Sequence, residues 1–387
     1  MTEAPPRFAP LRLALFYGGI FLALGIMGPF WPLWLQDRGL DAEEIGLIFA
    51  LGTLAKLAVT PHFARAADRS GERRRILVVL TLFGTLTFLA FRWTEGFWPI
   101  AIVTVAFFAC RGPVLPLMES LTMLTRERVS FDYGRVRLWG SVTFILGAWG
   151  MGLILTDAPA SWIHWSIFIA VGLTFLSALA LPDTRAPAAE GIHRPFREIL
   201  RMPGLLMAMT AATLIQASHV VYYNFGSIHW LEAGHGADVI GALWAEGVIV
   251  EIVLFTFAAA VVRKVGAMPM IMIGAAAGVA RWAGTAVTTE VEWLILLQAL
   301  HGLSFGATHL GIIHLITERV SPSMSASAQS LFSMIMGVGM SAASYAAGHL
   351  FADLGGGAFM AMAGLSLAGA GCIGVSLLLR RILPGAT

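Results

Sequence analysis

Ten charged or histidine side chains inside long apolar stretches of this sequence are candidates for chemistry. Three are cations, three are carboxylates and four are histidines: Lys56, Arg111 and Arg281; Glu119, Glu246 and Glu251; His219, His301, His309 and His314. Lysine and arginine are the usual counter-ions of anions, whereas histidines and carboxylates bind and release protons. Because an isolated charge in apolar surroundings costs free energy, we expect each of these residues to be paired with another group or to serve a function.

The stretches around these residues are long enough to cross a lipid bilayer. Hydrophobic residues make up 57% of the 387 residues and charged residues 12%, about half the roughly 25% that is usual in soluble proteins. A helix needs about 20 apolar residues to cross the hydrocarbon core. Twelve such segments occur, at residues 12–35, 45–66, 76–93, 97–124, 138–156, 162–181, 205–231, 239–262, 268–288, 292–316, 325–350 and 357–379. A membrane barrel would instead show alternating segments of about ten residues. The sequence therefore predicts an all-α membrane protein with twelve transmembrane helices.

Composition and motifs exclude several other classes of protein. A net charge of +2 gives no electrostatic attraction to nucleic acid. Cys110 and Cys372 both lie in apolar segments and predict neither a disulfide framework nor a metal cluster. The sequence has no nucleophile elbow, phosphate-binding loop or zinc-binding histidine pair. We expect no enzymatic activity, no cofactor, no metal ion and no nucleic-acid partner.

Arginine and lysine residues concentrate on one side of the predicted membrane. Of the 25, 20 lie in the connections, or at the segment ends next to them, on the side of the N-terminus; 2 lie likewise on the opposite side, and 3 lie deep within the segments. The positive-inside rule therefore predicts that both termini are cytoplasmic, and Trp31 and Trp34 are expected as anchors at the outer interface. The first segment lacks a small-residue cleavage site, which indicates a retained helix. We expect a multi-pass monomer in a bacterial-type inner (plasma) membrane.

The longest polar interval divides the twelve segments six and six. It predicts an N-terminal six-helix bundle at 1–181, a cytoplasmic linker at 182–204 and a C-terminal six-helix bundle at 205–387. Two repeats of six helices are typical of secondary transporters, which bind substrate near the midplane between the repeats.

A charged loop after the second segment carries a recognisable motif. Residues 64–75 read Ala-Arg-Ala-Ala-Asp-Arg-Ser-Gly-Glu-Arg-Arg-Arg. This loop resembles the signature Gly-x-x-x-Asp-Arg-x-Gly-Arg-Arg of the major facilitator superfamily, with Ala64 in place of the first glycine and Glu72 in place of an arginine. Charge-assisted pairs in such a loop can hold a cytoplasmic gate closed and break when it opens. The predicted gate residues are Asp68, Arg69, Gly71, Arg73, Arg135 and Arg137.

Two further stretches, 132–141 and 300–305, resemble a narrower branch of this superfamily. That branch contains the 3-phenylpropionate transporters and is distantly similar to lactose permease and the nucleoside:proton symporters. Proteins like lactose permease have a glutamate one turn after the histidine of the tenth helix. Here that position is Ser304, so their proton-coupling arrangement does not carry over intact.

Cations at mid-depth and polar helix faces predict the substrate site. Lys56 and Arg111 would form a cationic wall suited to a carboxylate-bearing substrate. The seventh and tenth segments carry polar residues at helical spacing, and in the superfamily that the chain resembles these helices face the central cavity. The predicted substrate-binding residues are Lys56, Arg111, Tyr17, His219, Tyr222, Tyr223, Gln298 and His301.

Four residues are predicted to carry the coupled proton, namely Glu119, Glu246, Glu251 and His301. A buried glutamate can hold a proton at neutral pH, as coupling to a proton gradient requires. The predicted partners are accordingly a small-molecule substrate, protons and the lipid bilayer.

The predicted function is proton-coupled secondary transport by alternating access, importing a small organic solute. An aromatic carboxylate such as an arylpropionate is the first choice of substrate. Nucleoside or sugar:proton symport and proton-driven drug efflux are alternatives, and so is a membrane sensor built on a transporter fold. A channel would be expected to repeat a pore element or to carry rings of like charge, and the sequence has neither.

Overall fold

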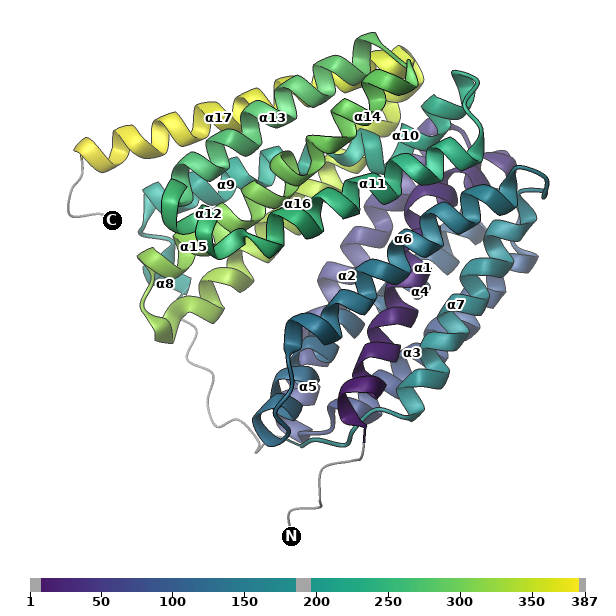
Figure 1. The fold of residues 1–387 in the computed structure, drawn as a ribbon, viewed down its shortest axis with the longest axis horizontal. Coiled ribbons are helices and arrows are strands. Elements are labelled where there is room, and N and C mark those ends of the chain that lie inside the picture. Colours follow the sequence, from purple (N-terminus) through teal and green to yellow (C-terminus); the bar gives the residue numbers. More distant parts are fainter. Residues whose placement is uncertain (1–7, 186–195, 383–387) are drawn as a thin grey trace. The chain divides into compact units, whose positions relative to one another are not determined.

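The computed structural model describes residues 8–185 and 196–382, and these residues form helices without any β-strand among them. The predicted all-α class is confirmed. Packing divides the chain into two compact units (Figure 1). The first unit comprises residues 1–191 and 234–245, and the second comprises 192–233 and 246–387. Residues 186–195 of the predicted linker lie outside the described residues, and the predicted domain boundaries stay a prediction.

Helix α1 is the most enclosed helix of the first unit and packs against α6 and α7. The elements of the described part of this unit are α1 (Ala9–Asp37), α2 (Ala42–Ser70), α3 (Arg73–Ala90), η1 (Phe91–Trp93), α4 (Phe97–Arg111), α5 (Val114–Arg128), α6 (Tyr133–Leu155) and α7 (Ser161–Leu179). The expectation that Trp31 and Trp34 anchor the membrane interface is wrong. Both side chains are buried, and their rings stack at 4.3 Å between centroids beside Phe88 and Phe91.

The second unit is built around α9, α13 and α17, which pack together. Its described elements are α8 (Phe196–Ile199), α9 (Pro203–Ala217), α10 (Val220–Glu232), α12 (Ala258–Val265), α13 (Ala267–Val287), α14 (Val291–Ala299), the π-helical segment η2 (Gly302–Ala307), α15 (Thr308–Arg319), α16 (Pro322–Leu354), η3 (Gly355–Gly357) and α17 (Ala358–Ile382). Helix α11 (Ala237–Thr256) begins in the first unit and belongs to the second from Glu246 onward.

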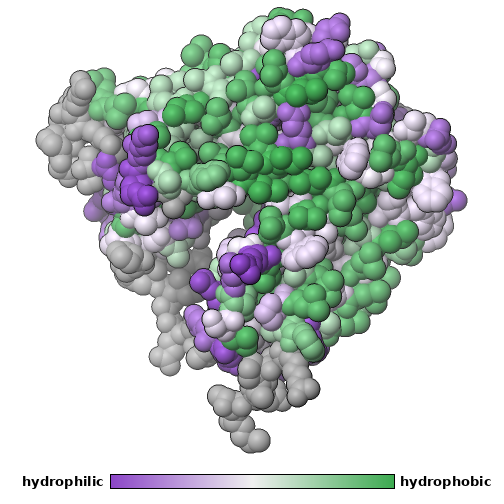
Figure 2. All heavy atoms as spheres, in the orientation of Figure 1, coloured by the Kyte–Doolittle hydropathy of each residue, from purple (hydrophilic) through white to green (hydrophobic). Residues whose placement is uncertain are grey.

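Eleven stretches of the described chain are long and apolar enough to cross a membrane. The last two predicted segments, 325–350 and 357–379, fall into one such stretch, Met324–Leu378. Large apolar side chains remain on the surface; on α7, for example, Ile169, Leu173 and Leu176 are exposed. The face drawn in Figure 2 carries broad apolar areas with hydrophilic residues gathered in patches. Such a surface requires an apolar surrounding, as a bilayer provides.

Several predicted continuous segments are interrupted in the structure, among them 239–262, which divides into α11 and α12 at Phe257. Segment 97–124 divides into α4 and α5 at Pro113, which has no N–H to continue the helix. Segment 205–231 divides into α9 and α10 at Ser218 and His219, whose side chains both bond the carbonyl oxygen of Ile215. Segment 292–316 passes from α14 through η2 to α15. Interrupted helices inside a membrane unit expose backbone groups that other side chains must satisfy.

Glycines allow the closest helix approach in the first unit. A Cβ atom placed on Gly25 of α1 would lie 2.2 Å from the carbonyl oxygen of Phe144 on α6. Gly150, also on α6, has open space where its Cβ would lie. The crossing of α1 and α6 therefore depends on the missing side chain of Gly25.

We expect Gly25→Ala to lower the stability of the folded protein by about 1–3 kcal/mol, because the neighbour is rigid backbone. Gly150→Ala is the matched control and should leave stability unchanged or slightly raised. Thermal unfolding of the purified protein in detergent, followed by intrinsic fluorescence, measures both. Equal midpoints for the two variants would contradict the packing argument.

Candidate functional site

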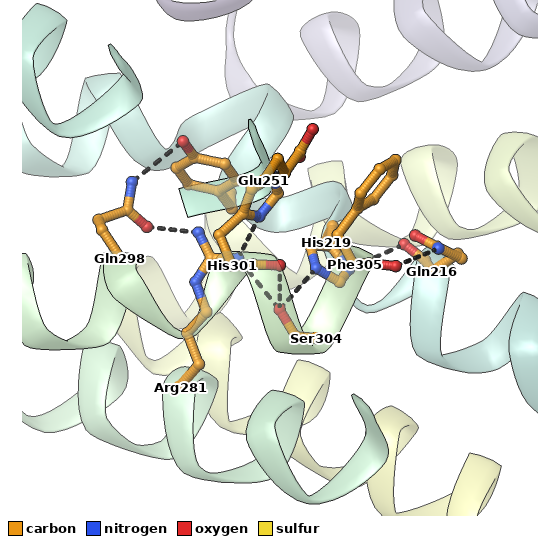
Figure 3. Close-up of polar contacts among 9 residues, drawn as sticks. Gln216, His219, Glu251, Arg281, Gln298, His301, Ser304 and Phe305 are labelled. Carbon is orange, nitrogen blue, oxygen red and sulfur yellow. Dashed lines mark hydrogen bonds and ion pairs between the residues drawn. The ribbon is translucent and has the colours of Figure 1, made fainter. Parts of the chain in front are cut away.

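The most enclosed polar cluster described in the second unit surrounds Arg281 of α13. This side chain is fully buried, with 0% of its surface exposed. Its NH1 group donates to Nδ1 of His301 at 2.7 Å and to Oγ of Ser304 at 3.4 Å. Its NH2 group donates to Oε1 of Gln298 (Figure 3). The guanidinium is thus held by neutral acceptors from α14 and the start of η2.

Two aromatic rings cover the faces of the same guanidinium. Its Cζ atom lies 4.8 Å from the ring centroid of Tyr222 and 4.3 Å from that of Trp282. Cation–π contacts of this kind stabilise a charge more strongly when it is removed from water. The hydroxyl of Tyr222 also accepts a hydrogen bond from Nε2 of Gln298 at 3.0 Å. Helix α10 therefore supports both the cation and one of its acceptors.

His301 connects Arg281 to a carboxylate. Its Nε2 lies 2.7 Å from Oε1 of Glu251 on α11. A guanidinium can only donate hydrogen bonds, so Nδ1 of His301 must be the acceptor. The hydrogen of the neutral imidazole then sits on Nε2 and is donated to Glu251. A neutral ring thus bridges one buried cation and one buried carboxylate.

A second histidine reaches the cluster through Ser304. Nδ1 of His219 lies 3.0 Å from the carbonyl oxygen of Ile215, which can only accept, so this nitrogen carries the hydrogen. Nε2 of His219 accepts from the hydroxyl of Ser304 at 3.1 Å. The ring of Tyr223 stacks on His219 with a centroid separation of 5.8 Å. The interruption between α9 and α10 places His219 at this position.

Close packing of α11 against η2 brings Glu251 to His301. A Cβ atom on Gly302 would lie 2.7 Å from Cγ1 of Val250, and one on Gly247 would lie 3.3 Å from Cδ2 of His301. At the end of this π-helical segment the carbonyl oxygen of Phe305 accepts from the backbone N–H of Thr308 and also from Nε2 of Gln216, the latter at 3.2 Å. Such π-helical segments are frequent at functional sites.

In the first unit, Lys56 and Arg111 lie next to each other on α2 and α4. Gly112 follows Arg111, and a Cβ atom on it would lie 2.7 Å from Cγ of Lys56, so the lysine stem crosses this glycine. The two cations are close enough to interact electrostatically. Within residues 8–185 and 196–382, neither side chain has a hydrogen bond or an ion pair with a carboxylate. They form a positive pair without a counter-ion in the described chain.

The structure places Glu119 in a separate cluster with Arg137. Oε1 of Glu119 lies 3.3 Å from Nε of Arg137, and Oε2 accepts from the hydroxyl of Tyr133 at 2.8 Å. The Arg137 guanidinium lies 5.5 Å from the ring centroid of Tyr17, whose hydroxyl is 3.2 Å from Oγ1 of Thr122. One predicted proton carrier, one predicted gate residue and one predicted substrate residue are therefore neighbours. Glu246 is half-buried on α11 and near enough to Arg281 to interact electrostatically.

The predicted gate loop is only partly tied together. Asp68 pairs with Arg73 at 2.7 Å, and Arg73, whose side chain is 8% exposed, also donates from Nε to Oγ of Ser120. Gly71 ends α2 with a φ of 70°, a conformation that favours glycine. Arg69 is exposed, and Arg135 makes an exposed contact with Asp132 at 3.5 Å. Of the predicted gate arginines in this loop, Arg73 is the buried one, and its carboxylate partner Asp68 is partly exposed.

This chain combines many apolar helices, interruptions within some of them and a buried charge cluster at one interruption. That combination is typical of membrane transport proteins. The comparisons give the family. Residues 11–362 match the model of the MFS_1 like family, so the chain belongs to the major facilitator superfamily of transporters. It is not an enzyme.

Individual relatives and structures agree with this assignment. The chain is 31% identical over 367 residues to the "Probable 3-phenylpropionic acid transporter" of Escherichia coli (strain K12), covering 92% of this chain and 94% of that one. It is 22% identical to the lactose permease of Citrobacter freundii, covering 78% of each chain. The crystal structure of the nucleoside transporter NupG covers 96% of this chain and 99% of its own, with a TM-score of 0.80 and 16% identity, which shows the fold.

The cluster unites five predicted site residues and adds two that were not predicted as site residues. His219, Tyr222, Gln298, His301 and Glu251 come together as described above. Arg281 was counted among the intramembrane cations but received no role, because no residue on its own helix indicates its partners. Ser304, one turn after His301, was the available signal for a shared acceptor.

We expect Asp68→Asn to lower the free energy of unfolding by about 1–3 kcal/mol, because it leaves the buried Arg73 guanidinium without its carboxylate. The matched control in the same loop is Glu72→Gln, whose carboxylate contacts the exposed Arg75 at 3.3 Å and the exposed Arg185 at 3.5 Å. That change should cost less than about 1 kcal/mol. Thermal unfolding of both variants decides, and a larger loss for Glu72→Gln would show that the Asp68–Arg73 pair is not the structural one.

Proposed function

We propose that this transporter imports a small aromatic carboxylate, such as an arylpropionate, together with a proton by alternating access. In this proposal twelve helices cross the membrane, with α16 and α17 as separate crossings joined by η3. Both termini are cytoplasmic, in keeping with the 20 of 25 cations on that side. The protein acts as a monomer in the inner membrane.

The observation that carries the proton coupling is the chain from Glu251 through His301 to Arg281. Its two charges, one on Glu251 and one on Arg281, balance each other across a neutral imidazole. A proton on this chain removes that balance inside a low-dielectric unit, so the chain must rearrange or take up an anion. The groups involved lie on α11, α13 and η2, and their rearrangement changes how these helices pack.

An anionic substrate is supported by the cations and by a named relative. Lys56 and Arg111 form a pair without a counter-ion in the described chain, and a membrane unit that holds two such charges attracts a carboxylate. The relative with 31% identity is named for the transport of 3-phenylpropionic acid. Within the second unit, the predicted aromatic residues of α10 supply surface for a phenyl group.

We expect Glu251→Gln to reduce accumulation driven by a proton gradient by about tenfold or more, equivalent to at least about 1.4 kcal/mol. Exchange of labelled for unlabelled substrate should persist, because exchange needs no net proton movement. Proteoliposomes with and without an imposed pH gradient separate the two activities. Glu292→Gln, which alters an exposed carboxylate at the start of α14, is the control and should transport normally. Unchanged accumulation by Glu251→Gln would remove this residue from the mechanism.

We further expect 3-phenylpropionate to stabilise the purified protein and 3-phenylpropionamide, its uncharged analogue, to have little effect. A ligand at about 100 times its Kd stabilises the folded state by about 2.7 kcal/mol. A thermal-shift series with the acid, the amide, nucleosides and sugars measures this. Stabilisation by a nucleoside or a sugar, and not by the acid, would contradict the proposed substrate class.

A further inference from the structure

Both terminal nitrogens of Arg281 are occupied by neutral acceptors. NH1 donates to Nδ1 of His301 and NH2 donates to Oε1 of Gln298, so the two acceptors lie on the same edge of the fork. The two oxygens of a carboxylate bind a guanidinium fork at these same two positions, and that pairing is charge-assisted. In the described part of the chain, no carboxylate is within ion-pairing distance of Arg281. His301 and Gln298 therefore occupy the two positions at which a carboxylate would bind Arg281 more strongly.

Each of these acceptors keeps a second partner when it leaves Arg281. His301 retains its 2.7 Å contact with Glu251, and Gln298 retains its 3.0 Å hydrogen bond to Tyr222. The Tyr222 and Trp282 rings would continue to cover the guanidinium faces, because the exchange takes place at its edge. Replacing the two neutral acceptors by one anion thus leaves few polar groups without partners.

The contact with Arg281 also blocks one atom of His301 from protonation. Nδ1 uses its lone pair to accept from NH1, and Nε2 already carries the hydrogen donated to Glu251. A second proton on the ring has to go to Nδ1, where it would face a donor at 2.7 Å. A proton and the Arg281 NH1 group therefore compete for a single lone pair.

We propose that the substrate's carboxylate binds Arg281 in place of His301 and Gln298, and that this exchange frees Nδ1 of His301 to take up the coupled proton. The inference rests on the proposed function, since it takes an anionic substrate and proton coupling as given. It assigns to Arg281 a carboxylate-binding role and to His301 the atom that receives the proton. Arg281 is a substrate residue, and Gln298 positions it in the empty state.

Charge balance makes the two binding events depend on each other. The empty cluster contains one cation, Arg281, and one anion, Glu251. A bound carboxylate alone gives this buried cluster a net negative charge, and a proton alone gives it a net positive charge. Both states are costly in low dielectric. One carboxylate with one proton restores neutrality, so the expected stoichiometry is one proton per substrate.

The groups facing His301 are compatible with this exchange. Glu246 and Glu251 belong to α11, and Arg281 belongs to α13. His219 directly precedes α10 and Tyr222 lies on it, while Phe305 lies on η2 and His309 on α15. His219 has both nitrogens occupied, by Ile215 and by Ser304, and neither contact involves the cation directly. His301 is accordingly the histidine whose acceptor nitrogen is released when Arg281 changes partner.

Calorimetric titration of the purified full-length chain with 3-phenylpropionate tests the proposal. Repeating it in two buffers of different ionisation enthalpy counts the protons taken up on binding. We expect about one proton per ligand for the wild type. In His301→Asn, whose amide oxygen can still accept from Arg281, binding should be weaker, because the carboxylate enters without a proton, and proton uptake should be close to zero.

Arg281→Lys keeps the positive charge but loses the guanidinium group that binds both oxygens of a carboxylate. The affinity of this variant for 3-phenylpropionate should therefore fall about tenfold or more. Arg263→Gln removes an exposed cation of α12 and should bind and take up protons as the wild type does. Thermal unfolding shows whether Arg281→Lys is folded; if it is not, proton uptake by His301→Asn decides alone.

The outcomes separate this inference from the proposed function. Proton uptake by His301→Asn equal to that of the wild type, or unchanged affinity of a folded Arg281→Lys, overturns the inference and leaves proton-coupled import standing. Absence of binding by the wild type, together with no accumulation in proteoliposomes, overturns both. Binding with proton uptake that is lost in His301→Asn supports the inference.

Discussion

A guanidinium that is enclosed by apolar helices must be satisfied by the protein itself, and this requirement organises the polar part of the second unit. Arg281 receives acceptors from α14 and η2 and aromatic faces from α10 and its own helix. An uncompensated charge at this depth costs about 2.5–3.5 kcal/mol by insertion scales. Because so many elements contribute to one cation, a change at any of them is felt by the others. Glu251 joins the arrangement through the His301 ring.

Interruptions in the helices make this convergence possible. Side chains of a regular helix project at fixed angles, which limits how many can meet at one atom. The interruption at His219 and the π-helical segment after His301 alter those angles and also release carbonyl groups. His219 satisfies one such carbonyl at Ile215, and Gln216 donates a further hydrogen bond to the carbonyl oxygen of Phe305. Glycines 247 and 302 then let α11 approach closely. The side chains that bond backbone groups at these interruptions thus lie in the same cluster as those that bind the buried charge.

Much of the fold was predictable because hydrophobic length is a local property of sequence. The helical class and the family followed from apolar segments and the loop containing Asp68, and His219, Gln298 and His301 followed from polar spacing on single helices. The role of Arg281 did not follow from the sequence in this way, because its partners come from other helices and no spacing on α13 indicates them. The interruptions were also missed, because Ser218 and His219 are compatible with a continuous helix until their carbonyl partners are known. Trp31 and Trp34 were misplaced because aromatic residues near a segment end suit both an interface and a core.

The two units differ in how their buried charges are balanced, and this difference suits a division of tasks. In the second unit Arg281 and Glu251 cancel through a neutral ring, so the cluster is stable when empty and responds when a charge is added. In the first unit Lys56 and Arg111 reinforce each other, so the pair is relieved by an anion from outside the described chain. A carboxylate attracted by the uncompensated pair and then bound by Arg281 carries a charge opposite to that of the proton accepted by His301. Moving them together adds no net charge to the low-dielectric interior, whereas moving either alone does. Electroneutral coupling is thus the least costly cycle that these charges permit.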